Sequence, residues 1–293
     1  MITRPLGPGG PNVSAMSFGG MPLSISGRPD EDTAIDVIHA VLDAGVTLLD
    51  TANVYCLDDD DIGHNEKLFA KALSTWTGSK DEIVLATKAG LIRPEGRWER
   101  DGRPESIRAA CEKSLKALNV DCIDLYQFHA PDTDVPFADS VGAFAELQAQ
   151  GKARWIGLSN ATVEQIDEAK KIVDVMTVQN RLNPFFKESP HDGVVAHCAS
   201  LGIGYLAYSP VGGGRLNKKL PSHPAVKPIA ERLGVSPHAV VLAWVLAQGP
   251  NVIPIPAARS IANALDSTKV PEVDLTGADI AAIDKAEFSI AKD

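Results

Sequence analysis

The chain has 293 residues, of which 44% are apolar and 23% charged, with a formal net charge of -10. These are ordinary globular values, and a chain of this length buries a core without disulfide or metal support. The negative charge argues against general binding of nucleic acid, because acidic surfaces repel phosphate. The four cysteines show no C-x-x-C spacing, and no apolar run approaches 18 residues. We therefore expect reduced thiols, a cytoplasmic protein, no membrane span and no metal site.

The chain opens with a segment rich in glycine and proline, Thr3–Gly20. Turn residues between short apolar pieces predict a β-hairpin that leads into a first strand. From Asp30 onward, helical and strand patterns alternate. The strands are predicted at Ala15–Phe18, Val46–Asp50, Glu82–Thr87, Cys122–Phe128, Ala153–Leu158, Val175–Val178, Ile203–Ala207 and Val252–Ile255. The helices are predicted at Ala34–Leu42, Glu66–Leu73, Pro104–Leu118, Pro136–Gln150, after Thr162, at Pro190–Leu201, at Ser236–Gln248 and after Ser260.

Strands that alternate with helices along the whole chain predict a parallel sheet. Eight such units without a linker favour a closed (β/α)8 TIM barrel over an open sheet, so we expect one domain over residues 1–293. A long loop is predicted before Ser236, and a short C-terminal helix at Thr276–Glu287.

Ionisable side chains recur where the predicted strands end. Asp50 ends the second strand with Tyr55 five residues later, Lys88 follows the third strand and His129 the fourth. Chemistry in such barrels gathers at these strand ends. A phenol is a poor acid at neutral pH, and a nearby ammonium would favour its phenolate. Lys88 could supply that charge, held by Asp50, while His129 orients a carbonyl oxygen for protonation.

Each of these residues also has an ordinary structural explanation. Asp50 alone could cap a turn, Lys88 could extend its ammonium to the barrel rim, and a histidine after a strand is commonly a structural hydrogen-bond partner. Four such residues at neighbouring strand ends are harder to explain by chance, so we interpret them as a catalytic group.

These residues in their local sequence resemble the Asp–Tyr–Lys–His tetrad of aldo-keto reductases. The tetrad positions are Asp50 in Asp-Thr-Ala, Tyr55, Lys88 after Ala-Thr, and His129 after Gln-Phe. The likeness covers nearly all of the chain, in the same order. It extends through His64–Glu66, Gly151–Asn160, Val178–Asn180 and Tyr208–Pro210.

The resemblance implies a barrel that binds an extended nicotinamide dinucleotide without a Rossmann fold. It places the nicotinamide carboxamide on Ser159, Asn160 and Gln179, with the ring stacked on Tyr208. The pyrophosphate would pass along a glycine-rich segment, where backbone N–H groups meet phosphate oxygens. The further cofactor contacts that it implies are Gly20, Met21, Asp50, Ser209, Pro210, Val211, Gly212, Gly213, Arg259, Asn263 and Asp266.

Arg259 suits the 2′-phosphate of NADP(H), because a guanidinium matches phosphate geometry. We therefore expect NADP(H) in preference to NAD(H). The chain departs from the family pattern nearby, with Ala257–Ala258 where Gly-Thr or Lys-Ser is common. Asn263 and Asp266 replace the usual Arg or Gln and the usual Glu.

The expected function is reduction of aldehydes or ketones to alcohols, or the reverse oxidation, with hydride from nicotinamide and a proton from Tyr55. The partner would be a small carbonyl or alcohol, and the oligomeric state stays open. Arg93, Arg97 and Trp98 are the expected substrate-loop contacts, and the acidic run Asp58–Asp61 is expected to form a solvated loop. Two alternatives remain: a cofactor-binding regulatory subunit with little turnover, and a Schiff-base aldolase that uses Lys88.

Overall fold

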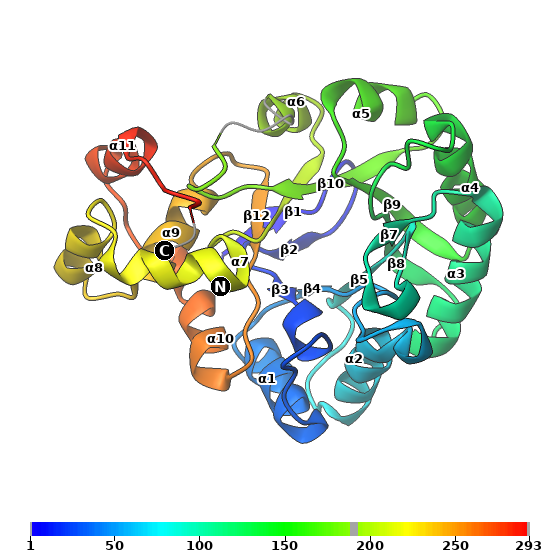
Figure 1. The fold of residues 1–293 in the computed structure, drawn as a ribbon, viewed down its shortest axis with the longest axis horizontal. Coiled ribbons are helices and arrows are strands. Elements are labelled where there is room, and N and C mark those ends of the chain that lie inside the picture. Colours follow the sequence, from blue (N-terminus) through cyan, green and yellow to red (C-terminus); the bar gives the residue numbers. More distant parts are fainter. Residues whose placement is uncertain (1, 188–192, 292–293) are drawn as a thin grey trace.

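The chain forms a barrel of eight parallel strands with helices around it (Figure 1). The computed structural model describes residues 2–187 and 193–291. Backbone N–H groups of Ser17 and Gly19 donate to the carbonyls of Pro254 and Pro256, at 3.1 and 2.9 Å, and close the barrel between its first and last strands. The predicted (β/α)8 barrel is confirmed. Its strands are β3 (Phe18–Gly19), β4 (Leu48–Asp50), β5 (Val84–Ala89), β8 (Ile123–Phe128), β9 (Ala153–Ser159), β10 (Val175–Arg181), β11 (Gly204–Tyr208) and β12 (Val252–Ile255).

Helices connect successive strands and cover the outside of the barrel. Several begin at the side-chain caps expected from sequence, such as Asp30, whose carboxylate accepts from the Thr33 N–H at 2.9 Å. The α-helices are α1 (Glu31–Asp43), α2 (His64–Thr75), α3 (Pro104–Leu118), α4 (Phe137–Ala149), α5 (Val163–Ala169), α6 (Val194–Ser200), α7 (Gly213–Leu216), α8 (Lys227–Leu233), α9 (Pro237–Leu246), α10 (Ile261–Thr268) and α11 (Gly277–Lys285). The 3-10 helices are η1 (Met21–Leu23), η2 (Asp59–Asp61), η3 (Pro94–Gly96), η4 (Asn217–Ser222) and η5 (Val270–Glu272).

Two antiparallel hairpins accompany the barrel. The predicted N-terminal hairpin is present, with β1 (Thr3–Pro5) paired to β2 (Asn12–Ser14). It packs on the barrel so closely that a Cβ at Gly204 would lie 1.9 Å from the Leu6 carbonyl oxygen, which explains the glycine there. A second hairpin, β6 (Leu91–Ile92) with β7 (Glu99–Arg100), follows β5 and was not predicted.

The apolar core has an outer and an inner part. The outer part lies between the strands and the helices, as where Tyr126 and Phe128 of β8 contact Phe144 of α4. The inner part fills the barrel and is sealed by the hairpin through Leu6 and Val13. We call this inner set the barrel plug; it comprises Leu6, Val13, Leu48, Val84, Ala86, Leu125, Met176, Leu206, Ile253 and Ile255. The hairpin covers one end of the barrel, and the opposite end, beyond the plug, is polar.

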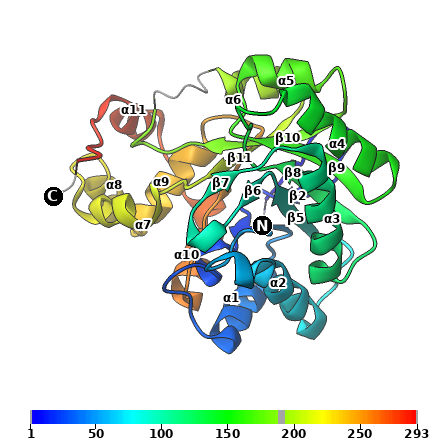
Figure 2. The same cartoon turned by 45° about the vertical axis from the view of Figure 1, so that its right-hand side comes forward.

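Two sequence predictions need correction. The first barrel strand begins at Phe18, because Ala15 and Met16 turn away to pack against α9. The long loop predicted before Ser236 is largely helical and contains α7, η4 and α8 (Figure 2). These short helices lack the long apolar periodicity that makes a helix visible in sequence. The predicted helix Pro190–Leu201 corresponds to α6, and its first residues lie outside the described ranges.

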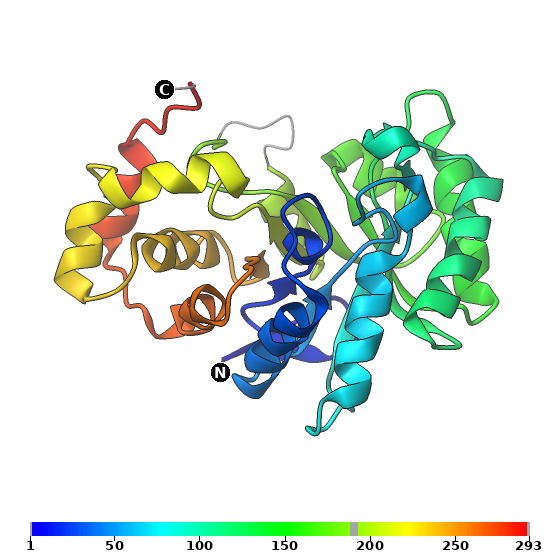
Figure 3. The same ribbon diagram turned by 60° about the horizontal axis from the view of Figure 1, so that its bottom comes forward.

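The helices α7 to α11 gather on one side of the barrel, yellow to red in Figure 3, opposite the green helices. At their centre α9 is buried on almost every side, from Ala239 to Leu246, which explains its nearly uniform apolar sequence. Within the described ranges no single helix is long and apolar enough to cross a membrane. In the described part of the chain, α8 and α9 taken together pass by length and composition, and they are bent by 97°.

Candidate active site

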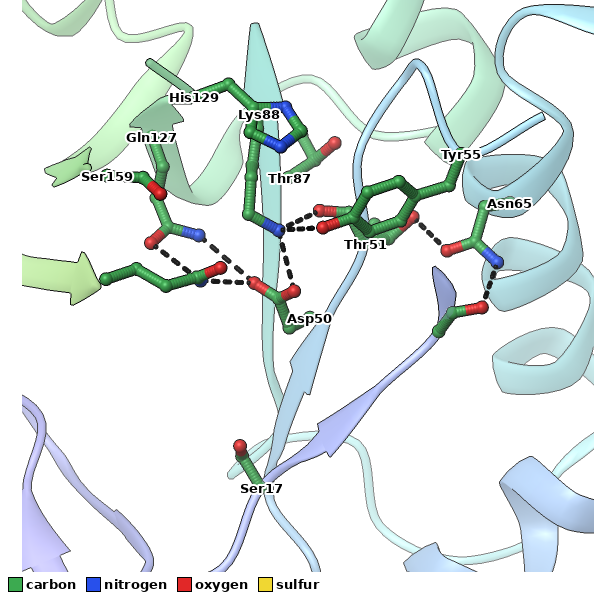
Figure 4. A network of polar contacts seen from close by, with 12 residues as sticks. Ser17, Asp50, Thr51, Tyr55, Asn65, Thr87, Lys88, Gln127, His129 and Ser159 are labelled. Atoms are coloured by element: carbon green, nitrogen blue, oxygen red, sulfur yellow. Dashed lines mark hydrogen bonds and ion pairs between the residues drawn. The ribbon is translucent and has the colours of Figure 1, made fainter. Parts of the chain in front are cut away.

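Above the plug, the inside of the barrel becomes polar. Alternate residues of a strand point to the same face. The residues two positions beyond plug residues on β4, β5 and β8 are Asp50, Lys88 and Gln127, and all three are buried. Figure 4 shows these side chains converging. Gln127 was not predicted as a site residue. The signal in the sequence was an amide side chain at an inward-facing position of a buried strand.

Lys88 lies at the centre of this polar layer. Its Nζ donates to Asp50 Oδ2 at 2.6 Å, to the Thr51 carbonyl at 2.8 Å and to Tyr55 Oη at 3.1 Å. An ammonium has three protons, and all three are used here. Lys88 is also 0% exposed. A Schiff-base lysine must present a free amine to its substrate, so this geometry argues against the aldolase alternative.

The electrostatics of the pair follow mainly from burial. Burial lowers the pKa of Lys88, and the charge of Asp50 opposes that shift. Burial raises the pKa of Tyr55 well above its usual range, and the negative charge of Asp50 adds to the effect. The attraction between Lys88 and a phenolate would by itself lower the pKa of Tyr55. In the folded protein desolvation is the larger effect, so Tyr55 keeps its proton at neutral pH.

His129 lies beside Tyr55 at the end of β8. The two rings meet edge to face, with centroids 5.8 Å apart and an interplanar angle of 83°. Burial, assisted by the charge of Lys88, lowers the pKa of His129 well below its usual value. The imidazole is therefore neutral at pH 7. Its Nδ1 is buried and has no hydrogen-bond partner among the described residues.

One elongated cavity of about 860 Å³ opens over this group. Tyr55 and His129 line one part of it, and segments following β3, β11 and β12 line the rest. It is within the usual size of cofactor pockets. Residues singled out from the sequence as cofactor contacts line it, namely Met21, Asp50, Ser159, Asn160, Gln179, Tyr208, Ser209, Pro210, Val211, Gly213, Arg259, Asn263 and Asp266. The sequence analysis missed other lining residues, among them Leu91, Asn217 and His238, which lie on segments without a motif.

Two expected contacts lie outside this cavity. The carbonyl of Gly20 accepts from Asn65 Nδ2 at 2.9 Å, and a Cβ at Gly20 would lie 2.2 Å from the Phe69 ring. Its glycine is thus explained by packing. Gly212 has φ 87° and lines a smaller neighbouring cavity of about 260 Å³ with Arg181 and Arg215. A positive φ strains any other residue, so the turn itself requires this glycine.

Asn160 connects the wall of the cavity to His129. Its backbone has φ +56°, an uncommon value for a residue other than glycine. Its Nδ2 donates to the His129 carbonyl at 3.0 Å, and its Oδ1 accepts from Tyr208 Oη at 2.7 Å. Backbone strain of this kind gathers at functional sites, where the surroundings hold it in place. The two bonds fix the Tyr208 ring over the cavity.

Comparison with known proteins agrees with this geometry. The model of the Aldo/keto reductase family matches residues 15–287, which is most of the chain. The chain belongs to the aldo/keto reductase family. It is an NAD(P)H-dependent oxidoreductase.

Solved structures of aldo/keto reductases superpose on nearly the whole chain. The glycerol dehydrogenase of Gluconobacter oxydans is 30% identical and superposes with a TM-score of 0.80. The match covers 94% of this chain and 91% of the dehydrogenase chain. The holo form of an aldo-keto reductase from Bacillus halodurans is 28% identical, with a TM-score of 0.80 and coverage of 100% and 98%. An aldo-keto reductase from Klebsiella pneumoniae in complex with NADPH is 25% identical, with a TM-score of 0.80 and coverage of 97% and 95%.

Arg259 and residues of α10 line one part of the reductase cavity. Arg259 donates from Nε to the Pro22 carbonyl and from Nη2 to the Ser26 carbonyl, both at 3.0 Å. A guanidinium has five N–H groups, so three remain for an anion. Asp266 Oδ2 accepts from Ser236 Oγ at 2.5 Å, which fixes its carboxylate beside the cavity.

Beside Tyr55, residues of the β6–β7 hairpin line the reductase cavity. Of the three expected substrate-loop contacts, Trp98 lines the cavity, with its ring edge-on to Tyr55 at 6.3 Å. Arg93 lies beneath the Trp98 ring, 3.9 Å from its centroid, and bonds to the carbonyls of Cys56 and Leu57. Arg97 instead pairs with exposed acids of its own loop. Apolar Leu91 completes this wall.

The acidic run Asp58–Asp61 does not line the described cavity. Asp59 and Asp60 are exposed, as expected for a solvated loop. Asp61 differs, because its carboxylate pairs with Arg28 at 2.6 Å and accepts from the Leu57 N–H at 3.1 Å. Asp61 therefore ties this loop to the segment after β3, while Asp59 and Asp60 are exposed to solvent.

Proposed function

We propose that this reductase converts aldehydes or ketones to alcohols, or catalyses the reverse oxidation, with NADP(H) in preference to NAD(H). The observation that carries the proposal is the 3.1 Å contact between Lys88 Nζ and Tyr55 Oη beside a cavity of cofactor size. The aldo-keto reductase of Klebsiella pneumoniae in complex with NADPH supports the choice of cofactor. When bound, the cofactor supplies a hydride to the carbonyl carbon.

The residues of the cavity fit a nicotinamide dinucleotide. Ser159, Asn160 and Gln179 offer hydroxyl and amide groups near Tyr55, suited to a carboxamide. A Cβ at Gly214, which lines the cavity, would meet nothing within 4 Å, so the backbone there is open to a phosphate. The three remaining N–H groups of Arg259 suit the 2′-phosphate that distinguishes NADP(H) from NAD(H).

In the proposed reaction Tyr55 is the proton donor. Lys88 donates a hydrogen bond to the phenol oxygen, which leaves the phenolic hydrogen to point into the cavity. As the proton leaves, the same ammonium stabilises the phenolate, and Asp50 holds Lys88 in place. His129 is neutral and can donate a hydrogen bond to the substrate oxygen, which orients the carbonyl for protonation.

A Tyr55→Phe protein tests the proposal. The change removes one oxygen, whose hydrogen-bond partner in the described structure is Lys88. We expect single-turnover oxidation of bound NADPH by aldehydes to slow about 10²- to 10⁴-fold, with NADPH binding nearly unchanged. A variant that kept full carbonyl reduction would refute Tyr55 as the donor. Wild-type protein that bound NADPH tightly but failed to turn over a broad panel of carbonyls would instead indicate a cofactor-binding regulatory subunit.

A further inference from the structure

Gln127 is a buried side chain to which the proposed reaction assigns no role. It is 0% exposed and lies on β8, in register with Lys88 of β5. Its Nε2 donates to Asp50 Oδ1 at 3.2 Å, and its Oε1 accepts from Gln179 Nε2 at 3.2 Å. Gln179 Nε2 also donates to Asp50 Oδ1, at 2.8 Å. The three side chains form a closed triangle of hydrogen bonds. Figure 4 shows Gln127 and Asp50 beside Lys88.

The neighbouring strand leaves room for this arrangement. Gly157 of β9 is in register with Gln127. A Cβ at Gly157 would lie 2.9 Å from Gln127 Cγ and 2.5 Å from Thr177 Oγ1. Contacts this short force a shift, so the Gln127 side chain can lie where it does because residue 157 is glycine. The residues paired across β8 and β9 thus determine where the Gln127 amide lies.

The triangle also fixes which way the Gln179 amide faces. Gln127 gives its Nε2 to the carboxylate, so only its oxygen is left for Gln179, and an oxygen accepts but does not donate. Gln179 must therefore present its nitrogen to both neighbours. Its Oε1 has no donor among the described residues, and Gln179 lines the cavity. The amide is held as an acceptor toward the cavity.

We propose that Gln127 is a positioning residue that orients Gln179 to accept a hydrogen bond from the cofactor carboxamide and anchors Asp50 in the same contact. The inference rests on the proposed function, in which Gln179 meets the carboxamide. Asp50 Oδ2 holds Lys88 while Asp50 Oδ1 receives both glutamines, so one carboxylate connects the cofactor end of the site to the proton donor.

A Gln127→Met protein tests this inference. Methionine has a similar length and no hydrogen bonds to offer, so one N–H of Gln179 is left buried without an acceptor. The readout is the ratio of dissociation constants for NADP⁺ and its 3-acetylpyridine analogue, in which an acetyl group replaces the carboxamide and removes its N–H donor. Wild-type protein should bind NADP⁺ more tightly than the analogue. In the variant this ratio should fall by about threefold to tenfold, which corresponds to the free energy of one ordinary hydrogen bond.

Two further variants make the result decisive. Gly157→Ala displaces Gln127 without changing its chemistry and should reduce the same ratio, if thermal melting shows that it folds. Gln148→Met removes a half-buried glutamine of α4, far from Gln179 in the sequence, whose side chain donates to the Arg154 carbonyl in the described structure, and it should leave the ratio unchanged. An unchanged ratio in folded Gln127→Met protein overturns the inference while the proposed function stands. Wild-type protein that bound neither dinucleotide would overturn both.

Discussion

The ion pair between Asp50 and Lys88 gives the sharpest test of the electrostatic reasoning. Its Nζ–Oδ2 distance is 2.6 Å, and the two side chains are 5% and 0% exposed. Asp50→Asn keeps the size of the side chain and removes its charge, which leaves the Lys88 ammonium buried without a counter-ion. Breaking a buried pair in this way costs about 3–5 kcal/mol in the free energy of unfolding. Carbonyl reduction should fall about 10²- to 10⁴-fold, because without Asp50 the lysine carries its charge less readily and stabilises the phenolate of Tyr55 less.

The pH dependence of this loss has a definite sign. Burial already lowers the pKa of Lys88 below its ordinary value of 10.5, and Asp50 opposes that shift. Without Asp50 the pKa falls further. A base with a lowered folded pKa contributes stability above its unfolded pKa and loses it as pH falls through the folded pKa. The deficit of Asp50→Asn relative to wild type should therefore be large at neutral pH and shrink as pH rises toward 10.5.

Urea unfolding at several pH values, beside single-turnover reduction, measures both effects. Asp124→Asn is a matched control, because Asp124 lies on the adjoining strand β8, accepts from the Leu85 N–H at 3.1 Å and does not contact Lys88. The control should keep carbonyl reduction near that of wild type. A stability deficit for Asp50→Asn that stayed constant or grew with rising pH would refute the assignment of Lys88 as the uncompensated charge.

Three further outcomes follow from the site. Arg259→Ala should weaken NADPH binding about tenfold or more in equilibrium titrations, the loss expected for one charge-assisted hydrogen bond. NADH binding should stay within about twofold of wild type. Equal losses for both cofactors would show that Arg259 only bonds to the Pro22 and Ser26 carbonyls. Burial raises the pKa of Glu66, so wild-type stability is lost as pH rises through that raised value. Glu66→Gln should therefore melt at a higher temperature than wild type at pH 8 and show no such gain near pH 4. Trp98→Ala should raise KM for carbonyls several-fold, because the substrate loses part of an aromatic contact, and should leave NADPH affinity unchanged. A matching loss of NADPH affinity would place Trp98 in the cofactor site.

Much of the site could be predicted because strand ends are visible in the sequence. Asp50, Lys88 and His129 each follow an apolar run, and a parallel barrel brings such positions to one end. The structure places them around Tyr55, and it shows the Asp50–Lys88 contact. The sequence named Lys88 as a charge that favours the phenolate, but the raised pKa of Tyr55 follows mainly from burial, whose extent depends on everything packed around the ring.

Other features depended on partners far away in the chain. Gln179 and Asp50 are 129 residues apart, and no local pattern indicates that they bond. The role of Gln127 emerges only when β8 lies between Lys88 on one side and Gly157 on the other. Arg259 was predicted as a phosphate ligand from its residue type, yet its contacts with Pro22 and Ser26 required the barrel to close.

By itself, the sequence determined the barrel, the order of its strands and the identity of the ionisable residues at their ends, because these depend on periodicity and on short motifs. The tertiary structure decided which of those residues touch, how deeply each is buried and which proton each holds. Those properties arise from packing and desolvation between segments distant in the chain, and Gln127 beside Asp50 is the clearest example.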